Sequence, residues 1–318
     1  MGHKPMNLSE MFVVRHTYSR KAKHYVRMHG TIGFGATGLA GDALRVVREH
    51  GLVPEGIYDG KLCRESRHNH MEMDAVLKGI LDAIISKKGA HLSKVWPETI
   101  ESILDIYLGE MPESFQFDAK TYTPRTFADQ LMINPDDFIG VSSYTHQPFH
   151  KNFVLQVPDN WGYNQYLNLP LNEFMEVIDH AIENGFSMVW DGDITENSFK
   201  QALGIALLPL KEWDQRTREE RANICKIPET EKEITQELRQ ESFDNYKTTD
   251  DHLMHITGLA TDQNGTKFYK AKNSWGIQSS KYGGYVYMSE SYTRSKTVSV
   301  VLHKDGLPPK IAEHLEKN

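Results

Sequence analysis

The chain has 318 residues, of which 39% are hydrophobic and 25% are charged, and this is the composition of a globular rather than a disordered protein. Its 36 basic and 43 acidic residues give a net charge of −7, which argues against a nucleic-acid or anionic-membrane surface. No apolar run approaches the ~18 residues of a membrane span, and two cysteines, Cys63 and Cys225, cannot form a disulfide framework. We therefore expect a cytoplasmic protein without a nucleic-acid or membrane partner.

The first sixty residues predict helices. A helix capped by Asn7 or Ser9 is expected to run to about Met28, and a second helix is expected over residues 42–49. The residues before Asn7 contain no apolar signal-peptide core. Because few domains begin inside a packed element, we expect either an abrupt start of the fold or a missing upstream segment.

The segment between these two helices is rich in glycine and reads Gly-Phe-Gly-Ala-Thr-Gly-Leu-Ala-Gly over residues 33–41. A phosphate-binding loop would need a preceding strand or a following Gly-Lys-Ser/Thr, and the sequence has neither. The pattern instead favours a tight turn that lets the backbone approach another group.

Residues 61–165 are expected to be largely helical, with irregular connections. Apolar residues recur at helical spacing over residues 74–85 and 99–108. A further helix is predicted to begin at Pro124, with Thr123 as its N-cap.

Residues 166–318 change from helix to strand after Gly185. An amphipathic helix is predicted over residues 171–183, and the charge-rich residues 211–241 are expected to be mostly helical with a solvated face. Strands are predicted over residues 186–190, 252–258, 267–272, 284–288 and 297–302.

The most specific pattern joins a histidine and an asparagine across a predicted hairpin. His252 begins one strand, Asn273 ends the next, and Asp262–Gly265 between them is a strong turn signal. Antiparallel pairing brings the start of one strand beside the end of the other, so the two side chains can meet. A carboxamide fixes the tautomer of an imidazole and leaves its second nitrogen for a nucleophile. Trp275 could cover this hydrogen bond from water.

These segments resemble papain-like cysteine peptidases. The resemblance rests on Asp-His252-x-Met with Gly258, on Lys272-Asn-Ser-Trp-Gly276, on Gly283-Gly-Tyr-Val-Tyr287 and on Leu8-Ser-Glu10. The bleomycin hydrolase and aminopeptidase C branch is the most similar, on the basis of Leu8–Val14, Gly51–Glu55, Asp250–His252 and a long helical insertion before Pro158-Asp-Asn-Trp161.

The resemblance implies an α+β, papain-like two-lobe fold, here N-terminally truncated, with a helical lobe and an antiparallel β-rich lobe. Residues 1–60 would be the remnant of the helical lobe, residues 61–165 a largely helical insertion, and residues 166–318 the β-rich lobe with the His/Asn hairpin and a C-terminal tail. Family members in this branch are often hexameric, and their own C-terminus restricts them to exopeptidase action. Leu315–Asn318 would be the corresponding tail.

The implied function is that of a cysteine-type aminopeptidase acting on peptides without a cofactor. His252 would be the general base, Asn273 would orient it, and Trp275 would shield the pair. In the family the catalytic cysteine precedes the Leu-Ser-Glu motif, and a glutamine for the oxyanion lies further upstream. Only seven residues precede Leu8 here, and they contain neither a cysteine nor a glutamine.

Neither cysteine of the sequence fits the missing nucleophile. Cys63 lacks a following tryptophan and an adjacent helix start that would lower its pKa, and Cys225 is no better placed. Both are expected to be structural thiols. The alternative is therefore a catalytically inactive homologue that binds peptides or assembles with other subunits.

Two further sets of residues could face a substrate. Papain-like enzymes pair an extended substrate with a Gly-Gly backbone edge, and Gly35 and Gly38 are the candidate contacts, although Ala36-Thr37 interrupts the run. Asp191 and Asp193 follow a strand that, as the resemblance implies, would approach the substrate cleft. We nevertheless favour the interpretation that both residues lie in an exposed turn.

A competing metal site would use His68, His70, Glu72 and Asp74, which could share one face of an extended segment. The segment runs into a helix, where its acidic residues favour the positive end of the dipole, and it lacks His-Glu-x-x-His spacing. A helix start is therefore favoured over a metal-dependent hydrolase.

Overall fold

The computed structural model describes residues 6–61, 68–87 and 91–315. It divides the chain into two compact units: unit 1 consists of Met1–Pro135 with Pro158–Gly162, and unit 2 consists of Asp136–Val157 with Tyr163–Asn318. Each unit has its own hydrophobic core.

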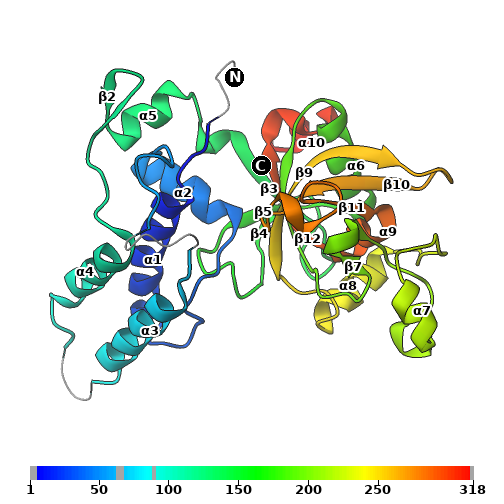
Figure 1. The fold of residues 1–318 in the computed structure, drawn as a ribbon, viewed down its shortest axis with the longest axis horizontal. Coiled ribbons are helices and arrows are strands. Elements are labelled where there is room, and N and C mark those ends of the chain that lie inside the picture. Colours follow the sequence, from blue (N-terminus) through cyan, green and yellow to red (C-terminus); the bar gives the residue numbers. More distant parts are fainter. Residues whose placement is uncertain (1–5, 62–67, 88–90, 316–318) are drawn as a thin grey trace. The chain divides into compact units, whose positions relative to one another are not determined.

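Unit 1 is built mainly of helices, drawn from blue to green in Figure 1. They are α1 (Glu10–Arg27), α2 (Ala40–His50), α3 (Met71–Ile85), α4 (Trp96–Leu108) and α5 (Pro124–Gln130), with a hairpin of β1 (Phe115–Phe117) and β2 (Lys120–Tyr122) before α5. These helices confirm the predictions over residues 9–28, 42–49, 74–85 and 99–108 and the helix start at Pro124.

Local signals place the ends of these helices. The Ser9 hydroxyl accepts a hydrogen bond from the backbone N–H of Phe12 at 2.9 Å and caps α1. Thr123 caps α5 by accepting from the N–H of Thr126 at 3.2 Å. Gly51 ends α2 with a φ of +91°, and a Cβ there would lie 2.2 Å from the carbonyl oxygen of Pro124.

The core of unit 1 follows the helical period. In α3 and α4 every fourth residue is buried, so that each helix turns one apolar stripe inward. The stripes consist of Met73, Leu77 and Leu81 in α3 and of Ile100, Leu104 and Leu108 in α4. They pack in one cluster with Phe12, Tyr18, Ala22 and Tyr25 of α1.

Among the described residues, unit 2 contains a ten-stranded sheet with the strand order β4-β5-β3-β12-β6-β9-β10-β11-β8-β7. The strands are β3 (Phe138–Ser142), β4 (Lys151–Val154), β5 (Gln165–Asn168), β6 (Met188–Gly192), β7 (Phe199–Lys200), β8 (Ile205–Ala206), β9 (His252–Thr261), β10 (Lys267–Lys272), β11 (Tyr285–Ser289) and β12 (Thr297–His303). The helices are α6 (Leu171–Glu183), α7 (Arg218–Asn223), α8 (Gln236–Asp244), α9 (Glu290–Lys296) and α10 (Pro309–Leu315). Short 3-10 helices include η2 (Gln201–Leu203) and η4 (Ile277–Ser279).

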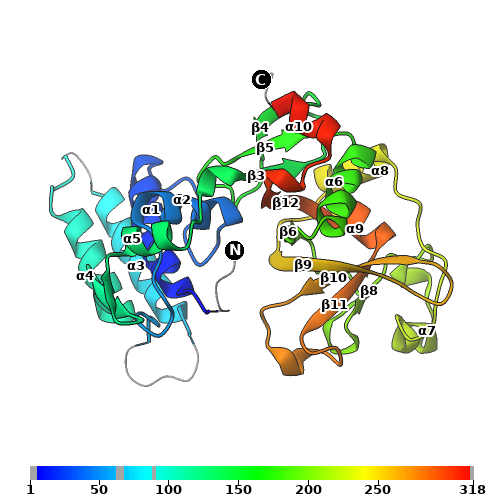
Figure 2. The same ribbon diagram turned by 90° about the horizontal axis from the view of Figure 1, so that it is seen from above.

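Helix α6 supplies much of the core of unit 2, and it lies beside the sheet in Figure 2. Its residues Phe174, Val177 and Ile178 are fully buried in one cluster with side chains of the strands. Trp190 of β6 is also fully buried, and its indole N–H donates to the Thr297 hydroxyl at 2.7 Å. This partner allows the large indole to lie in the core without an unsatisfied polar group.

The hairpin of β9 and β10 confirms the predicted turn. The Asp262 carboxylate accepts hydrogen bonds from the N–H groups of Asn264 and Thr266, both at 2.8 Å. Gly265 has a φ of +84°, a conformation that favours glycine. The pairing of Lys267 with Thr261 and of Lys272 with His255 sets the register of the two strands.

Two stretches differ from the predicted helical content. Residues 61–165 contain β3 and β4; β3 pairs with β12 and both strands pair with β5, so this part of the insertion belongs to the large sheet. Residues 211–241 contain α7 and the start of α8 rather than a mostly helical segment. In the first case the partner strand β12 is distant in the sequence, and local periodicity does not report such a partner. The lobe boundaries that the resemblance implies, at residues 60 and 165, stay a prediction.

The exposed turn predicted at Asp191 and Asp193 is wrong. Asp191 belongs to β6, where it pairs with both neighbouring strands, and its carboxylate accepts from the Ser299 hydroxyl at 3.0 Å. Asp193 is 1% exposed. The Asp-Gly-Asp pattern suggested a turn, but β9 and β12 pair with β6 on both edges, and Lys296 of α9 forms an ion pair with Asp193.

Candidate active site

The hairpin brings the predicted histidine and asparagine together. His252 is the first residue of β9, and Asn273 directly follows β10. The imidazole Nε2 of His252 lies 2.8 Å from the Oδ1 of Asn273, at hydrogen-bond distance. The antiparallel hairpin therefore places the two side chains as predicted.

Three further hydrogen bonds hold Asn273, which is buried, and two of them are made by its carboxamide. Its backbone N–H donates to the carbonyl of Gly284 at 3.1 Å, and its Oδ1 accepts from the backbone N–H of Ser274 at 2.7 Å. Its Nδ2 donates to the Oε1 of Gln201 in η2 at 3.0 Å. With these partners Oδ1 faces the imidazole as an acceptor, so His252 carries its proton on Nε2.

The second imidazole nitrogen of His252, Nδ1, has no hydrogen-bond partner among the described residues. With the proton on Nε2, Nδ1 carries a lone pair and can accept a proton. The ring of Trp275 lies 5.2 Å from the imidazole, at an interplanar angle of 45°. Trp275 itself is 50% exposed, and its shielding of the pair from water stays a prediction.

Chemically this is a general base with its orienting group, and such a base needs a nucleophile. Cys225 does not provide one. Its buried thiol donates to the carbonyl of Ser198 at 3.1 Å, and burial raises the pKa of the thiol to about 12. The thiolate is therefore disfavoured, as predicted for a structural cysteine. Cys63 lies outside the described residues.

The candidate substrate glycines lie in unit 1, in the loop before α2. The buried ammonium of Lys21 donates to the carbonyl of Gly35 at 2.9 Å and to that of Thr37 at 2.6 Å, so Lys21 of α1 holds this loop in place. A Cβ at Gly38 would lie 2.9 Å from the carboxylate of Asp42, which caps α2. The geometry explains Gly38, where a side chain would meet Asp42, whereas the space around Gly35 would admit a Cβ. The contact of either glycine with substrate stays a prediction.

The alternative metal site finds no support in its geometry. The described residues contain no group of three His, Cys, Asp or Glu side chains that could hold a metal ion. Glu72 accepts from the hydroxyl of Tyr107, and Asp74 accepts from the hydroxyl of Tyr18. Both carboxylates lie in the first turn of α3, as predicted for a helix start.

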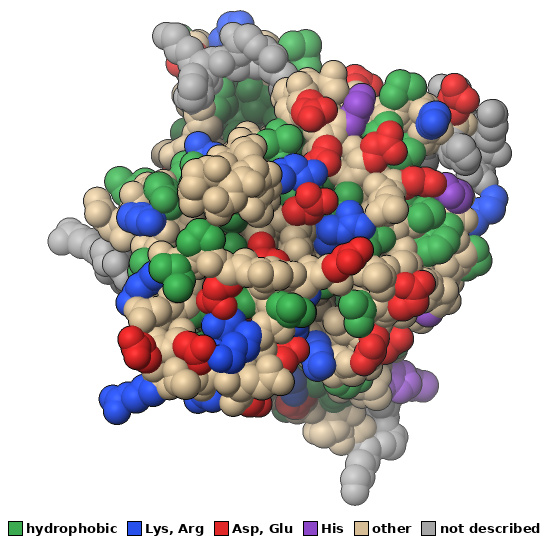
Figure 3. Space-filling view, turned by 90° about the vertical axis from the view of Figure 1, so that its right-hand side faces the viewer, with side chains coloured by type: hydrophobic (Ala, Val, Ile, Leu, Met, Phe, Trp, Pro, Cys, Tyr) green, Lys and Arg blue, Asp and Glu red, His purple; other side chains and the backbone are tan. Residues whose placement is uncertain are grey.

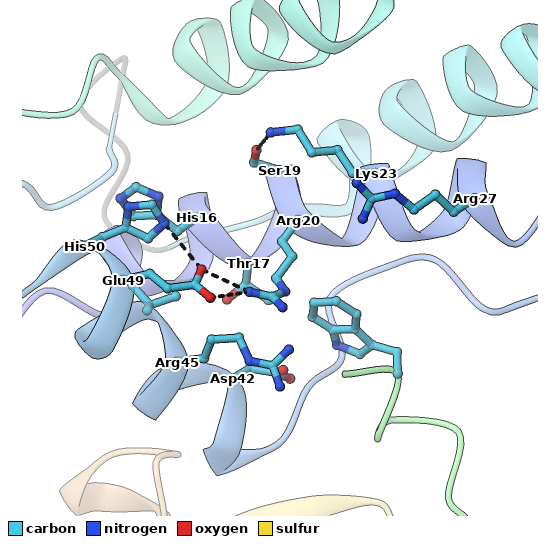
Figure 4. A pocket seen from close by; sticks show the side chains of 12 residues that line it. His16, Thr17, Ser19, Arg20, Lys23, Arg27, Asp42, Arg45, Glu49 and His50 are labelled. Carbon is cyan, nitrogen blue, oxygen red and sulfur yellow. Dashed lines mark hydrogen bonds and ion pairs between the residues drawn. The ribbon is translucent and has the colours of Figure 1, made fainter. Parts of the chain in front are cut away.

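A cavity of roughly 300 Å³ opens between α1 and α2 in unit 1 (Figure 4). His16 and His50 stack in it, with ring centroids 3.7 Å apart. Burial and the neighbouring His50 lower the pKa of His16 to about 3, so it is neutral at pH 7. Arg20 donates to both carboxylate oxygens of Glu49, at 2.8 and 3.0 Å. These groups bind one another, and none of the cavity's lining residues is a cysteine.

The surface of the protein is mixed in charge on the face drawn in Figure 3, where acidic and basic side chains are interspersed. Among the described residues, no helix is both long enough and apolar enough to cross a membrane.

One site residue was not predicted from the sequence. Gln201 lies 72 positions from Asn273, and its neighbours in the chain carry no motif. The contact arises because β7 and β8 lie beside β11 in the sheet, which brings η2 between them to the end of β10. No local signal could have indicated it.

The structure shares its fold with the crystal structure of PepW from Lactobacillus rhamnosis. The TM-score is 0.70 at 18% identity, over 99% of this chain and 76% of that chain. This match confirms the predicted α+β, papain-like fold. The family model described as Peptidase C1-like family matches residues 42–318, and the chain belongs to this family.

Curated relatives include aminopeptidase C of Lactobacillus helveticus, which is 23% identical over 83% of this chain and 61% of its own length. Aminopeptidase C of Streptococcus thermophilus is 23% identical over 81% of this chain and 60% of its own length. Aminopeptidase E of Lactobacillus helveticus is 24% identical over 74% of this chain and 52% of its own length. The chain thus spans at most about 60% of the length of these relatives.

Proposed function

We propose that the protein is a cysteine-type aminopeptidase in which His252 is the general base and Asn273 orients it. The hydrogen bond of 2.8 Å between these side chains carries the proposal, in a chain of the Peptidase C1-like family. The names of the relatives favour removal of amino-terminal residues from peptides. In this proposal the nucleophile is a cysteine that this chain does not contain, because Cys63 lacks the sequence context of the family's nucleophile and burial raises the pKa of Cys225 to about 12.

The proposed reaction follows from the tautomer of His252, in which Nε2 carries the proton and Nδ1 carries a lone pair. Nδ1 of His252 takes the proton of the catalytic thiol, and the thiolate attacks the carbonyl carbon of the first peptide bond. The C–N bond breaks, and the imidazolium returns its proton to the leaving amine. Water then attacks the thioester carbon and gives a proton to Nδ1; the C–S bond breaks, the acid leaves, and the imidazolium returns the proton to the thiolate. Asn273 stabilises the imidazolium through Nε2–H in both steps.

Three parts of the proposal concern the whole protein. Peptides are its substrates, the chain assembles as a homo-oligomer, and the tail Leu315–Asn318 limits access to the cleft so that only a free amino terminus reaches the nucleophile. Residues 316–318 lie outside the described residues. Trp275 shields the hydrogen bond between His252 and Asn273 in this proposal, and Gly35 and Gly38 pair with the substrate backbone.

The test uses the full natural product of the gene, including any coding sequence upstream of Met1. It is assayed for release of a fluorophore from aminoacyl substrates, with and without a thiol-alkylating reagent. We expect turnover that the reagent abolishes and that His252→Ala lowers by about 10²–10⁴-fold, the range for loss of a general base. His255→Ala is the matched control, because His255 lies on the same strand and donates to or accepts from Ser187 instead.

The second candidate is a catalytically inactive relative that binds peptides or assembles with other subunits. It is favoured by the burial and raised pKa of Cys225, the one cysteine among the described residues, which cannot act as a nucleophile. In that case the natural product shows no turnover, and its affinity for peptides is unchanged by His252→Ala. Turnover that survives alkylation but is lost with a chelator would contradict both candidates.

A further inference from the structure

Hydrogen bonds connect four side chains in a series that begins at the imidazole of His252 and ends at a backbone carbonyl. Nε2 of His252 meets Oδ1 of Asn273 at 2.8 Å, and Nδ2 of Asn273 donates to Oε1 of Gln201 at 3.0 Å. Nε2 of Gln201 lies 2.7 Å from the hydroxyl of Ser279, and that hydroxyl donates to the carbonyl of Gly276 at 2.7 Å. Every link is at hydrogen-bond distance.

The donor-to-acceptor direction of these hydrogen bonds is determined at the carbonyl of Gly276. The carbonyl of Gly276 can only accept, so the hydroxyl of Ser279 donates to it and accepts from Gln201. The amide nitrogen of Gln201 must then face Ser279, and its oxygen must face Asn273. This oxygen requires a donor, so Asn273 turns its nitrogen toward Gln201 and its oxygen toward His252. Three hydrogen bonds thus fix the orientation of the side-chain amides of Gln201 and Asn273.

We propose that Gln201 is a positioning residue that sets the tautomer of His252 by holding the carboxamide of Asn273 in one orientation. If the carboxamide were reversed, its NH₂ group would face Nε2 of His252 and would require an acceptor there. The imidazole proton would then lie on Nδ1, and His252 could not take a proton from a nucleophile. The effect of Gln201 on catalysis rests on the proposed function, whereas its effect on the tautomer of His252 does not depend on that function.

A second contact supports the same orientation. The backbone N–H of Ser274 donates to Oδ1 of Asn273 at 2.7 Å, so a reversed amide would set two donors against each other at that point. Loss of Gln201 therefore leaves one of two constraints in place. It also leaves the Nδ2 of Asn273, a residue only 4% exposed, without its acceptor, and a buried unsatisfied donor favours rearrangement.

The experiment is NMR of the chain labelled with ¹⁵N at histidine, because the nitrogen chemical shifts of a neutral imidazole report its tautomer directly. Wild type is compared with Gln201→Leu, which removes the acceptor at similar volume, and with Gln201→Glu, which keeps an oxygen facing Asn273. Gln263→Leu is the matched control, since Gln263 is exposed in the β9–β10 turn. The signal of His252 is assigned with His252→Gln.

We expect His252 to carry its proton on Nε2 in wild type, in Gln201→Glu and in the control. In Gln201→Leu the ratio of the Nδ1–H to the Nε2–H tautomer should rise by roughly fivefold to tenfold, as follows from losing one neutral hydrogen bond. A tautomer ratio in Gln201→Leu equal to that of wild type would overturn the proposal. So would an equal rise in Gln201→Leu and Gln201→Glu, because the acceptor oxygen would then not be the cause.

The kinetic counterpart uses the full natural product. If it is an active peptidase, Gln201→Leu should lower kcat with little change in KM, and Gln201→Glu should restore most of the loss. If wild type shows no turnover, the proposed function fails while the NMR comparison still decides the role of Gln201. A Gln201→Leu variant that has lost its native spectrum is replaced by Ser279→Ala, which frees the amide of Gln201 and should shift the tautomer in the same direction.

Discussion

Lys296 and Asp193 form an ion pair inside unit 2, with Nζ and Oδ2 3.2 Å apart and side chains that are only 3% and 1% exposed. The ammonium of Lys296 also contacts Glu196 at 2.6 Å and the carbonyl of Lys247. Burial alone would raise the pKa of Asp193, but hydrogen bonds from Thr195 and the charge of Lys296 hold it below its usual value. The pair joins the end of α9 to the end of β6, next to the residue that pairs with His252.

Removing one partner of this pair should be costly. Lys296→Met leaves Asp193 buried with an uncompensated charge, and we expect the free energy of unfolding to fall by about 3–5 kcal/mol. Urea denaturation followed by circular dichroism measures it. Lys304→Met is the matched control, because Lys304 is 52% exposed and its ion pair with Asp137 should contribute at most about 1 kcal/mol. Equal losses in the two variants would contradict the assignment.

Acid should destabilise unit 1 through His16. The pKa of His16 is lowered to about 3 in the folded protein, mainly by burial and then by His50 beside it, against an ordinary value of 6.5. Between these values the unfolded chain binds a proton that the folded chain does not, so stability falls as the pH falls from about 6.5 to 3.

The measurement for His16 is urea denaturation between pH 7 and pH 4. His16→Phe should flatten the dependence on pH in this window, because it keeps an aromatic ring against His50 and removes the titrating group. His29→Phe serves as the control, since His29 lies just beyond α1 rather than in the stack. A slope unchanged in His16→Phe would show that the acid sensitivity arises elsewhere.

Cys225 should be unreactive in the folded protein. Its thiol is buried, donates to the carbonyl of Ser198, and has a pKa raised to about 12 by burial. In a Cys63→Ser background, we expect a thiol reagent at pH 8 to label Cys225 only after urea is added. Rapid labelling without urea would mean an accessible thiolate, and Cys225 would return as a candidate nucleophile.

Gly192 should not tolerate a side chain. A Cβ there would lie 2.3 Å from the carbonyl of Lys296 and 2.4 Å from the ring of Trp190, and Gly192 pairs with His252 in the sheet. Gly192→Ala should lower the free energy of unfolding by about 1–3 kcal/mol, the range for overpacking.

The control for Gly192 is Gly258→Ala on β9. No heavy atom lies within 4 Å of the Cβ built at Gly258, so the substitution should change stability little. Thermal unfolding of the two variants against wild type makes the comparison. In the natural product, Gly192→Ala should also lower activity, because it shifts the strand beside His252; a fully active Gly192→Ala would contradict that coupling.

The sequence determined the elements whose signals are local. The caps at Ser9 and Thr123, the four-residue period of α3 and α4 and the Asp262–Gly265 turn each depend on neighbours within a few positions, and each was predicted. The pairing of His252 with Asn273 was also predictable, because a tight hairpin reduces a separation of 21 positions to the geometry of one strand pair. Their catalytic role stays a prediction.

The tertiary structure alone decided the rest. Asp191 and Asp193 have the composition of a turn, and only the strands on both sides of Asp191 and the contact of Asp193 with Lys296 of α9 account for their burial. Residues 138–142 join the sheet as β3 because they pair with β12, more than 120 positions away. Gln201 reaches Asn273 across 72 positions through the order of the strands. Contacts of this kind depend on which segments become neighbours in the sheet, and that arrangement is set by burial of the whole apolar core rather than by any local pattern.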